Sequence, residues 1–258
     1  MRDTPVIGIV SAPAWFDPAP SEFPTVVEED VRTQQAPLLL PDFDYRLESI
    51  ARVQPELNHC ARSLAAMGCH LVAQVGSPFA WAGALSESDA RMRSDSMDAA
   101  AGIPVVMTSL AIVDGLRALG ATSVALNCTY YDTDWRNHFE AFMRMCAFDV
   151  RHASTLVDQG LIPPDSQMKD VGWNMTDDLA RRSILSVAEA SPEADAIVVT
   201  GAGTRTLSLL ADMESRIQRP IIAADTILYW AIARELNLTL KPTMGSLANI
   251  RGQVVELK

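Results

Sequence analysis

Basic residues are scarce in this chain. Lys and Arg number 21 against 32 Asp and Glu in 258 residues, and the formal net charge is -11 with no cluster of basic side chains. Such a chain repels a phosphate backbone, because nucleic-acid affinity comes largely from Lys and Arg that neutralise phosphates. We therefore expect no nucleic-acid partner. Charged residues make up only 21% of the chain and hydrophobic residues 48%, which favours a folded core over disorder.

Long hydrophobic runs are lacking as well. The longest apolar stretches, such as 103–107 and 196–199, are far shorter than the ~20 residues that a membrane-spanning helix needs. The first residues show no basic region followed by an apolar run and a cleavage site. We therefore expect no membrane partner, no secretory signal and a cytoplasmic location.

Cysteine is sparse and lacks the spacing of a metal or redox motif. The four cysteines form no C-x-x-C pair, and the four histidines do not lie at ligand spacing from them. This usage suits a reducing compartment better than a disulfide scaffold. The sequence therefore predicts neither disulfides nor a metal site.

Short β-branched runs alternate with longer amphipathic stretches along the chain. Continuous apolar strands separated by helices are typical of parallel sheets covered on both faces, so the sequence predicts an α/β fold. The expected strands are 6–10, 70–75, 104–107, 123–126, 196–200 and 221–224. The expected helices are 47–67, 86–101, 109–119, 134–146, 176–190, 206–217 and 226–236.

This pattern occurs twice. In each half a strand runs into a turn with glycine, Gly76 or Gly201, and then come a helix, a strand that follows proline and a further helix. Any α/β chain is self-similar at this level, but the matched glycines favour a true repeat. We expect two pseudo-symmetric lobes, each a mainly parallel four-stranded sheet flanked by helices, with the site in the cleft between them. The expected bounds are 1–118 plus about 225–258 for the first lobe and 119–224 for the second.

Two segments interrupt the pattern, namely 15–41, which is rich in proline and acid, and 161–173. Connections this long are often lids or binding loops, although a solvated excursion fits equally well. Aromatic residues on loops at the same edge of the sheets predict an apolar pocket, with core packing as the alternative for each. These are Trp15, Phe16, Phe79 and Trp81.

The carboxyl ends of the strands are the expected binding edge, since ligands of open parallel sheets bind there. A glycine turn lets the backbone approach a ligand, and the N–H groups that follow can hold an anion. The turn 201–203 is a weak dinucleotide signal, because Thr206 occupies the place of the third glycine. Two such turns suit a small carboxylate. The expected binding residues are Pro13, Gly76, Asn127, Gly201, Ala202, Gly203, Thr204 and Arg205.

Several motifs make the chain similar to a known superfamily. They include the strand 7–10, the turn Gly76-Ser77, the helix–strand joint 114–124, Tyr130 and the segment 219–230. Over nearly its whole length the sequence resembles the aspartate/glutamate racemase superfamily, closest to its arylmalonate decarboxylase and maleate isomerase branch. The resemblance implies chemistry without a cofactor on a small carboxylate or dicarboxylate.

The chain departs from this superfamily at two positions. Its racemases and maleate isomerases carry one Cys at each of two facing strand ends, and the decarboxylases keep only the second, which protonates an enediolate after carbon dioxide departs. Here the two positions are Gly76 and Gly201, so neither thiol is present. A side chain is expected to fit at position 201 if φ of that residue is negative. What the resemblance leaves is the anion hole, in which Ser77 and Tyr130 hold the carboxylate.

Two residues are candidates for the missing acid and one for a substrate clamp. Cys128 lies beside Tyr130, Asp225 ends the last strand, and Arg205 is able to hold a carboxylate in a bidentate way. Each has a plain alternative: a small buried hydrophobe for Cys128, a helix cap for Asp225 and a solvated cation for Arg205.

Three functions stay open at this stage. The first is a cofactor-independent lyase resembling arylmalonate decarboxylase that acts through an enediolate with a proton source other than Cys. The second is an isomerase or racemase of small dicarboxylates that uses Asp225 or Cys128. The third is a non-catalytic carboxylate-binding homologue. The sequence does not fix the oligomeric state, and a homo-oligomer is compatible with each function.

Overall fold

The computed structural model of the chain describes residues 4–13, 15–172 and 174–250. The outermost parts of the predicted first lobe, 1–3 and 251–258, lie outside the described residues, as does Trp173 at the end of the second long connection.

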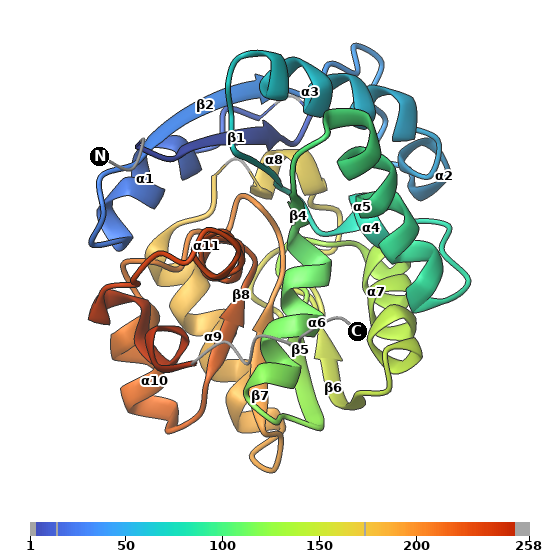
Figure 1. The fold of residues 1–258 in the computed structure, drawn as a ribbon. Coiled ribbons are helices and arrows are strands. Elements are labelled where there is room, and N and C mark those ends of the chain that lie inside the picture. The colour runs from blue at the N-terminus through green and yellow to red at the C-terminus, as the bar shows by residue number, and fades with distance from the viewer. Residues whose placement is uncertain (1–3, 14, 173, 251–258) are drawn as a thin grey trace.

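Two four-stranded sheets, each entirely parallel, form the two halves of the molecule (Figure 1). The first has the order β2-β1-β3-β4 and the second β6-β5-β7-β8, so the two halves share one topology. The predicted α/β class and the internal repeat are confirmed. The strands are β1 (Val6–Ser11), β2 (Arg32–Pro37), β3 (Leu71–Gln74), β4 (Val105–Met107), β5 (Ser123–Asn127), β6 (Asp149–Ser154), β7 (Ala196–Val199) and β8 (Ile221–Ala223).

Helices flank both sheets, and several begin at a polar cap. Ser86, Asp132 and Thr176 each accept a hydrogen bond from the backbone N–H three residues later, as N-cap residues do. No helix in the described part of the chain is long and apolar enough to span a membrane. The helices are α1 (Ala19–Val26), α2 (Leu47–Ile50), α3 (Gln54–Ala66), α4 (Pro78–Trp81), α5 (Glu87–Ala101), α6 (Thr108–Ala118), α7 (Thr133–Met145), α8 (Met168–Gly172), α9 (Asp177–Ala190), α10 (Leu210–Ile217), α11 (Ala224–Glu235) and a 3-10 helix (Pro242–Asn249).

The edge strands β2 and β6 are the two strands that sequence patterning missed. All side chains of β2 are exposed or half-buried, and only two in β6 are buried, so neither strand has the continuous apolar run that marks β1, β3, β5 and β7. The segment 15–41 is therefore not a long lid, because it contains α1 and β2. The connection 161–173 contains the short helix α8.

Two helix boundaries also differ from expectation. The expected helix 47–67 is divided into α2 and α3, since Pro55 lies in the first turn of α3 and its ring favours a new helix start. The helix expected at 206–217 begins only at Leu210.

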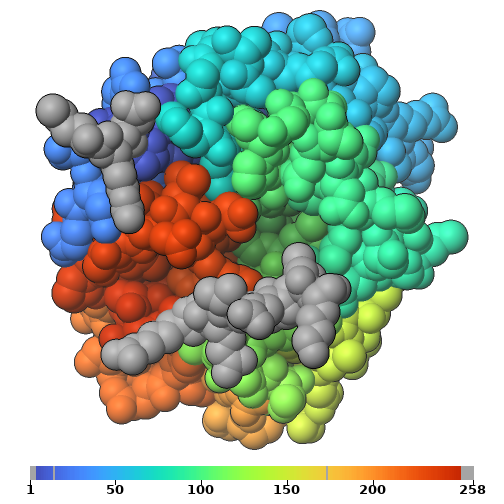
Figure 2. Space-filling model, in the orientation of Figure 1, coloured from blue at the N-terminus to red at the C-terminus, as the bar shows by residue number. Residues whose placement is uncertain are grey.

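Helix α11 joins the two halves. It follows β8 of the second sheet, yet it contacts α1, β3, β4 and α6, and its residues from Ala224 to Ala233 are all buried. The face drawn in Figure 2 shows the red chain of α11 beside the green helices, with a hollow between them. Charged side chains line this hollow, including Arg91, Asp98, Asp114, Arg234 and Glu235. The lobe boundaries near residues 118 and 225 stay a prediction. Helix α11 itself contacts elements of both halves.

Gly115 in α6 permits the close approach of α11. A Cβ atom at this position would overlap Cδ1 of Ile227 and lie 3.3 Å from its Cγ1. Alanine has the higher helix propensity by about 1 kcal/mol, but overpacking a core costs about 1–3 kcal/mol. We therefore expect Gly115→Ala to lower the free energy of unfolding.

The matched test uses Ile227→Val, which removes Cδ1. In the wild-type background this change should cost about 1 kcal/mol, as Ile-to-Val changes in cores do. In the Gly115→Ala background it should cost nothing or restore stability, because the overlapping atom is gone. Urea denaturation of the four proteins measures this coupling. Additive costs would show that the helix contact does not depend on the glycine.

Candidate active site

An apolar pocket lies where strand ends from the two sheets face each other. It encloses about 550 Å³, including its open mouth. Residues that follow β1, β3, β5 and β7 line it together with loop side chains, so both halves build one site. The lining residues are Ala12, Pro13, Trp15, Phe43, Tyr45, Gly76, Ser77, Pro78, Phe79, Tyr130, Tyr131, Trp135, Met168, Gly172, Gly201, Ala202 and Gly203.

The pocket contains some of the residues proposed from sequence and not others. Those that line it are Pro13, Gly76, Ser77, Tyr130, Gly201, Ala202 and Gly203. Those that do not are Asn127, Cys128, Thr204, Arg205 and Asp225. Among the aromatic candidates, Trp15 and Phe79 line the pocket, whereas Phe16 is exposed and Trp81 packs against Phe139.

Both glycine turns have a backbone conformation that disfavours a side chain. The φ angle is +107° at Gly76 and +91° at Gly201. A Cβ atom at Gly76 would lie 2.9 Å from Cε2 of Phe79, and one at Gly201 would lie 2.7 Å from Cε1 of Tyr130. The condition for a side chain at position 201, a negative φ, is therefore not met, and the aromatic ring of Tyr130 fills the space. The absence of cysteine at positions 76 and 201 is consistent with this backbone conformation, which favours glycine.

The ring of Tyr130 is fixed between glycines. A Cβ atom at Gly172 would also come within 3.1 Å of this ring, so glycines at positions 172 and 201 leave room for it. The Tyr130 oxygen accepts a hydrogen bond of 3.0 Å from the N–H of Gly203. Burial raises the pKa of Tyr130 to about 12, although the Gly203 N–H acts in the opposite direction. The phenol is therefore neutral at ordinary pH, and its own proton remains available for a bound anion.

Three further hydroxyls meet beside this ring. Tyr131 OH lies near the hydroxyls of Ser77 and Thr200, which both lower its pKa, while burial raises that pKa more strongly. Ser77 follows β3 and Thr200 follows β7, so the cluster joins the two halves. Each side chain is buried, and none of the three oxygens has a well-formed hydrogen bond within the described residues. Buried polar atoms without partners are costly, so this cluster is suited to the oxygen atoms of a ligand.

Sequence reasoning missed Tyr131. Its neighbour Tyr130 carried the resemblance, and a second tyrosine directly after it would point away if this segment continued as a strand. Instead the chain turns here: Thr129 has φ +41°, and the N–H of Tyr131 donates to the carbonyl of Cys128 at 3.0 Å. This turn allows both neighbouring tyrosines to line the pocket.

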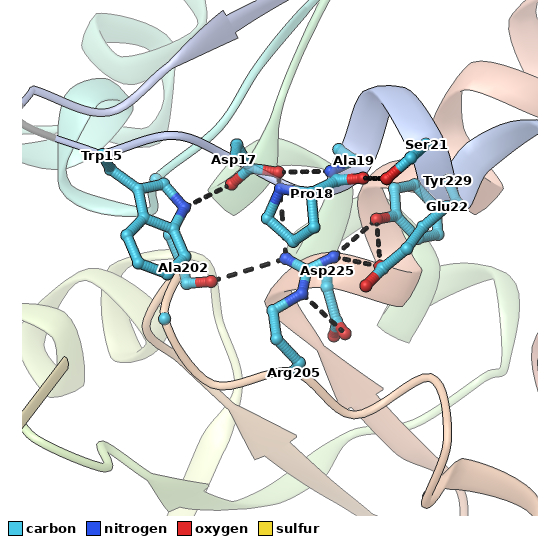
Figure 3. A network of polar contacts seen from close by, with 12 residues as sticks. Trp15, Asp17, Pro18, Ala19, Ser21, Glu22, Ala202, Arg205, Asp225 and Tyr229 are labelled. Atoms are coloured by element: carbon cyan, nitrogen blue, oxygen red, sulfur yellow. Dashed lines mark hydrogen bonds and ion pairs between the residues drawn. The ribbon is translucent and has the colours of Figure 1, made fainter. Parts of the chain in front are cut away.

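Arg205 is held by acidic residues rather than directed into the pocket (Figure 3). Its Nη2 donates to Glu22 and, at 2.6 Å, to the hydroxyl of Tyr229. Its Nη1 lies 3.9 Å from Asp17, and its Nε lies 4.0 Å from Asp225. Arg205 is therefore not a solvated cation, because it ties the turn after β7 to α1 and α11. Its predicted role as a substrate clamp stays a prediction.

Asp225 supports the same turn from the first turn of α11. Its carboxylate accepts hydrogen bonds from the N–H of Thr206 at 2.6 Å and from its Oγ1 at 2.7 Å. The N-cap of α11 is Ala223, so the alternative interpretation of Asp225 as a helix cap is wrong. Arg205 and its partners Asp17, Glu22, Asp225 and Tyr229 form a polar network beside the pocket. Asp17 connects this network to the pocket, because its carboxylate accepts a hydrogen bond of 2.8 Å from Nε1 of the lining residue Trp15. Burial raises the pKa of Asp17, and the nearby Arg205 opposes this shift.

Cys128 and Asn127 belong to the core of the second half. Cys128 is completely buried, and burial raises the pKa of its thiol. The Asn127 side-chain oxygen accepts hydrogen bonds from Thr129 N–H at 3.1 Å and from Ser183 Oγ at 2.9 Å. Thr204 is buried, and its N–H closes the turn onto the carbonyl of Gly201 at 3.0 Å.

The ionisable groups among the described lining residues are three tyrosines, Tyr45, Tyr130 and Tyr131. No Asp, Glu, His, Cys, Lys or Arg is among the lining residues that the structure describes. Nor do those residues contain a group of three or more His, Cys, Asp or Glu placed to hold a metal ion. The pocket therefore offers neutral O–H donors within apolar walls, an arrangement that can stabilise an oxyanion.

The strain at position 201 can be measured with a matched control. Gly201→Ala adds a Cβ atom both to a positive φ and to the space of the Tyr130 ring, whereas Gly68→Ala adds one at φ +82° with no atom within 4 Å. A residue forced into such a backbone conformation costs about 1–3 kcal/mol. We expect Gly201→Ala to lower the free energy of unfolding more than Gly68→Ala, because only the first displaces an aromatic ring. Equal costs in urea denaturation would contradict the steric account.

Comparison with known proteins places the chain in a family. Residues 7–248 match the family model described as arylmalonate decarboxylase. The chain is 27% identical over 146 residues to arylmalonate decarboxylase of Bordetella bronchiseptica, and this match spans about half of each protein, 54%. It is 24% identical over 205 residues to maleate isomerase of Geobacillus stearothermophilus, covering 78% of this chain and 77% of that protein. A structure of unliganded arylmalonate decarboxylase has the same fold, with a TM-score of 0.78 at 22% identity over 96% of this chain and 100% of that chain. This chain belongs to the arylmalonate decarboxylase family, a branch of the aspartate/glutamate racemase superfamily.

Proposed function

We propose that this protein is a cofactor-independent lyase that releases carbon dioxide from a small malonate bearing an apolar substituent. The observation that carries this proposal is the pocket itself, in which neutral hydroxyls from both halves lie within aromatic walls. Membership of the family supports lyase or isomerase chemistry on a small carboxylate.

The retained carboxylate of the substrate would bind to Ser77 and Tyr130. Ser77 Oγ is buried without a partner, and Tyr130 is oriented by the N–H of Gly203. When the bond from Cα to the departing carboxylate breaks, its electron pair moves onto Cα and the retained carboxylate, which becomes an enediolate. The O–H donors then face more negative charge than in the ground state, and this difference lowers the barrier.

The departing carboxylate would lie against the aromatic side of the pocket. Trp15, Phe79 and Trp135 contribute to these walls, which do not solvate an anion as water does. A carboxylate there is less stable relative to neutral carbon dioxide, which favours cleavage. The network around Arg205 supports this wall through Asp17, which holds the indole of Trp15.

The alternative functions receive less support from the geometry. An isomerase or racemase that uses Asp225 or Cys128 would need these groups at the substrate, whereas both lie outside the pocket lining. Asp225 is engaged by Thr206, and Cys128 is completely buried. A non-catalytic carboxylate-binding protein would use the same hydroxyls, and only turnover distinguishes it from the lyase.

Replacing Tyr130 with phenylalanine tests the oxyanion hole. Tyr130→Phe should lower kcat for an arylmalonate by roughly 10²–10³, the usual effect of removing one oxyanion donor, with the fold intact. The matched control is Tyr229→Phe, which removes a buried phenolic hydroxyl that binds Arg205 and Glu22 outside this pocket. The control should lower the melting temperature and leave turnover within a few-fold of wild type.

The assay is carbon dioxide release from a panel of aryl- and alkylmalonates, together with thermal melting. Near-wild-type turnover of Tyr130→Phe would remove Tyr130 from the site. Binding of malonates by the wild-type protein without any carbon dioxide release would overturn the lyase and support the carboxylate-binding alternative.

A further inference from the structure

A lyase of this kind needs an acid that protonates Cα after carbon dioxide leaves, and the two thiol positions of the superfamily are glycine here. The candidates from sequence, Cys128 and Asp225, do not line the pocket. The acid must therefore be sought among the groups that do line it. Of the described lining residues, only Tyr45, Tyr130 and Tyr131 carry a titratable proton.

Tyr131 has the geometry of a proton donor. Its side chain is 2% exposed, and its hydroxyl has no well-formed hydrogen bond within the described residues. Its ring packs edge to face against Tyr130 at 6.0 Å and against Trp135 at 5.0 Å, which fixes the direction of the O–H group. The hydroxyl lies beside Thr200, the residue directly before Gly201, and so at the strand end where the second thiol is missing.

The other two tyrosines are less suited to this role. The Tyr130 oxygen is held by Gly203, which orients this phenol as an oxyanion donor. Tyr45 lies in the loop between β2 and α2 and is only half-buried. Serine and threonine hydroxyls are much weaker acids than a phenol, so Ser77 and Thr200 are donors to oxygen rather than sources of a proton for carbon.

We propose that Tyr131 is the catalytic acid, whose phenolic proton is delivered to Cα of the enediolate, an assignment that rests on the proposed function. In this step the C–C bond to the leaving carboxylate has already broken, and its electron pair forms the new C–H bond. The O–H bond of Tyr131 breaks, and its electrons remain on the phenolate oxygen. A water molecule entering through the open mouth of the pocket returns a proton to the phenolate and leaves as hydroxide, so no oxidant, reductant or cofactor is consumed.

The surroundings of Tyr131 suit it both as a phenol before the proton transfer and as a phenolate after it. Burial raises the pKa of the phenol, so the donor is fully protonated at neutral pH. Ser77 and Thr200 lower that pKa, which means that they stabilise the phenolate once the proton has left. Because the pKa is raised above its ordinary value near 10, kcat should not fall between about pH 6 and pH 9 through loss of the donor's proton.

Stereochemistry distinguishes a proton donor from a further oxyanion donor. A prochiral 2-aryl-2-methylmalonate gives a chiral 2-arylpropionate, and an acid fixed on one side yields one enantiomer. Tyr131→Phe should slow steady-state turnover by about 10² or more, the usual effect of removing a general acid, because the enediolate must be protonated before the site can accept another substrate. Its product should be nearly racemic, because water protonates both faces. Tyr45→Phe, which removes another phenol of the pocket, should keep the enantiomer ratio of the wild type at whatever rate it retains.

A second measurement does not depend on decarboxylation. In D₂O the wild-type protein should exchange the α-hydrogen of a 2-arylpropionate for deuterium, since this reverses the protonation step. The base in that direction is the Tyr131 phenolate, so the exchange should be slow at neutral pH and faster at higher pH, and Tyr131→Phe should lower its rate by about 10² or more. Thermal melting checks the fold of the variant.

Thr200→Val gives an independent readout, because it removes a hydrogen-bond donor to the phenolate and keeps the Tyr131 hydroxyl. In this variant the deuterium exchange should slow severalfold, and the decarboxylation product should still be one enantiomer.

The outcomes separate the two proposals. If the wild type releases carbon dioxide and Tyr131→Phe keeps both the enantiomer ratio and the exchange rate, Tyr131 is not the acid while the lyase assignment stands. If the wild type exchanges deuterium, Tyr131→Phe does not, and neither releases carbon dioxide from any malonate, the assignment of Tyr131 as proton donor stands and the lyase assignment fails. If the wild type does neither, both proposals are overturned.

Discussion

The backbone at two glycines is the constraint on which the site depends. Gly76 and Gly201 follow the matching strands β3 and β7 with φ angles of +107° and +91°, and aromatic rings occupy the space that a side chain would take. This backbone conformation disfavours a side chain at either position, and the rings of Phe79 and Tyr130 take the space instead. The polar groups that line the pocket beside these turns are therefore hydroxyls, with the Tyr130 ring packed against Gly201.

The charged side chains near the site lie outside the pocket that the two glycine turns line. The carboxylates of Asp17, Glu22 and Asp225 surround Arg205 and join the two halves outside the pocket. Inside, among the described residues, lie neutral phenols, hydroxyls and indoles. Because an anion in an apolar site is stabilised only by the donors aimed at it, a few hydroxyls can discriminate strongly between a carboxylate and the charge that develops during its cleavage.

The sequence predicted the parts of the structure that follow from buried apolar patterns. The inner strands β1, β3, β5 and β7 are buried on both faces and were visible as β-branched runs, and the matched glycines predicted the repeat. The exposed edge strands β2 and β6 carry no such pattern. Arg205 and Tyr131 were misjudged or missed for a different reason. The partners of Arg205 lie on α1 and α11, far away in sequence, and Tyr131 reaches the pocket only through a turn at Thr129.

The most direct test of this account is a crystal structure of the protein with a bound arylmalonate or arylacetate. We expect one carboxylate of the ligand within hydrogen-bond distance, about 2.5–3.0 Å, of Ser77 Oγ and Tyr130 OH, and, in the malonate complex, the other carboxylate against Trp15 and Phe79. The hydroxyl of Tyr131 should face the α-carbon. A ligand carboxylate paired instead with Arg205, or a ligand bound in the charged hollow between α5, α6 and α11, would contradict the central claim that neutral hydroxyls hold the reacting group.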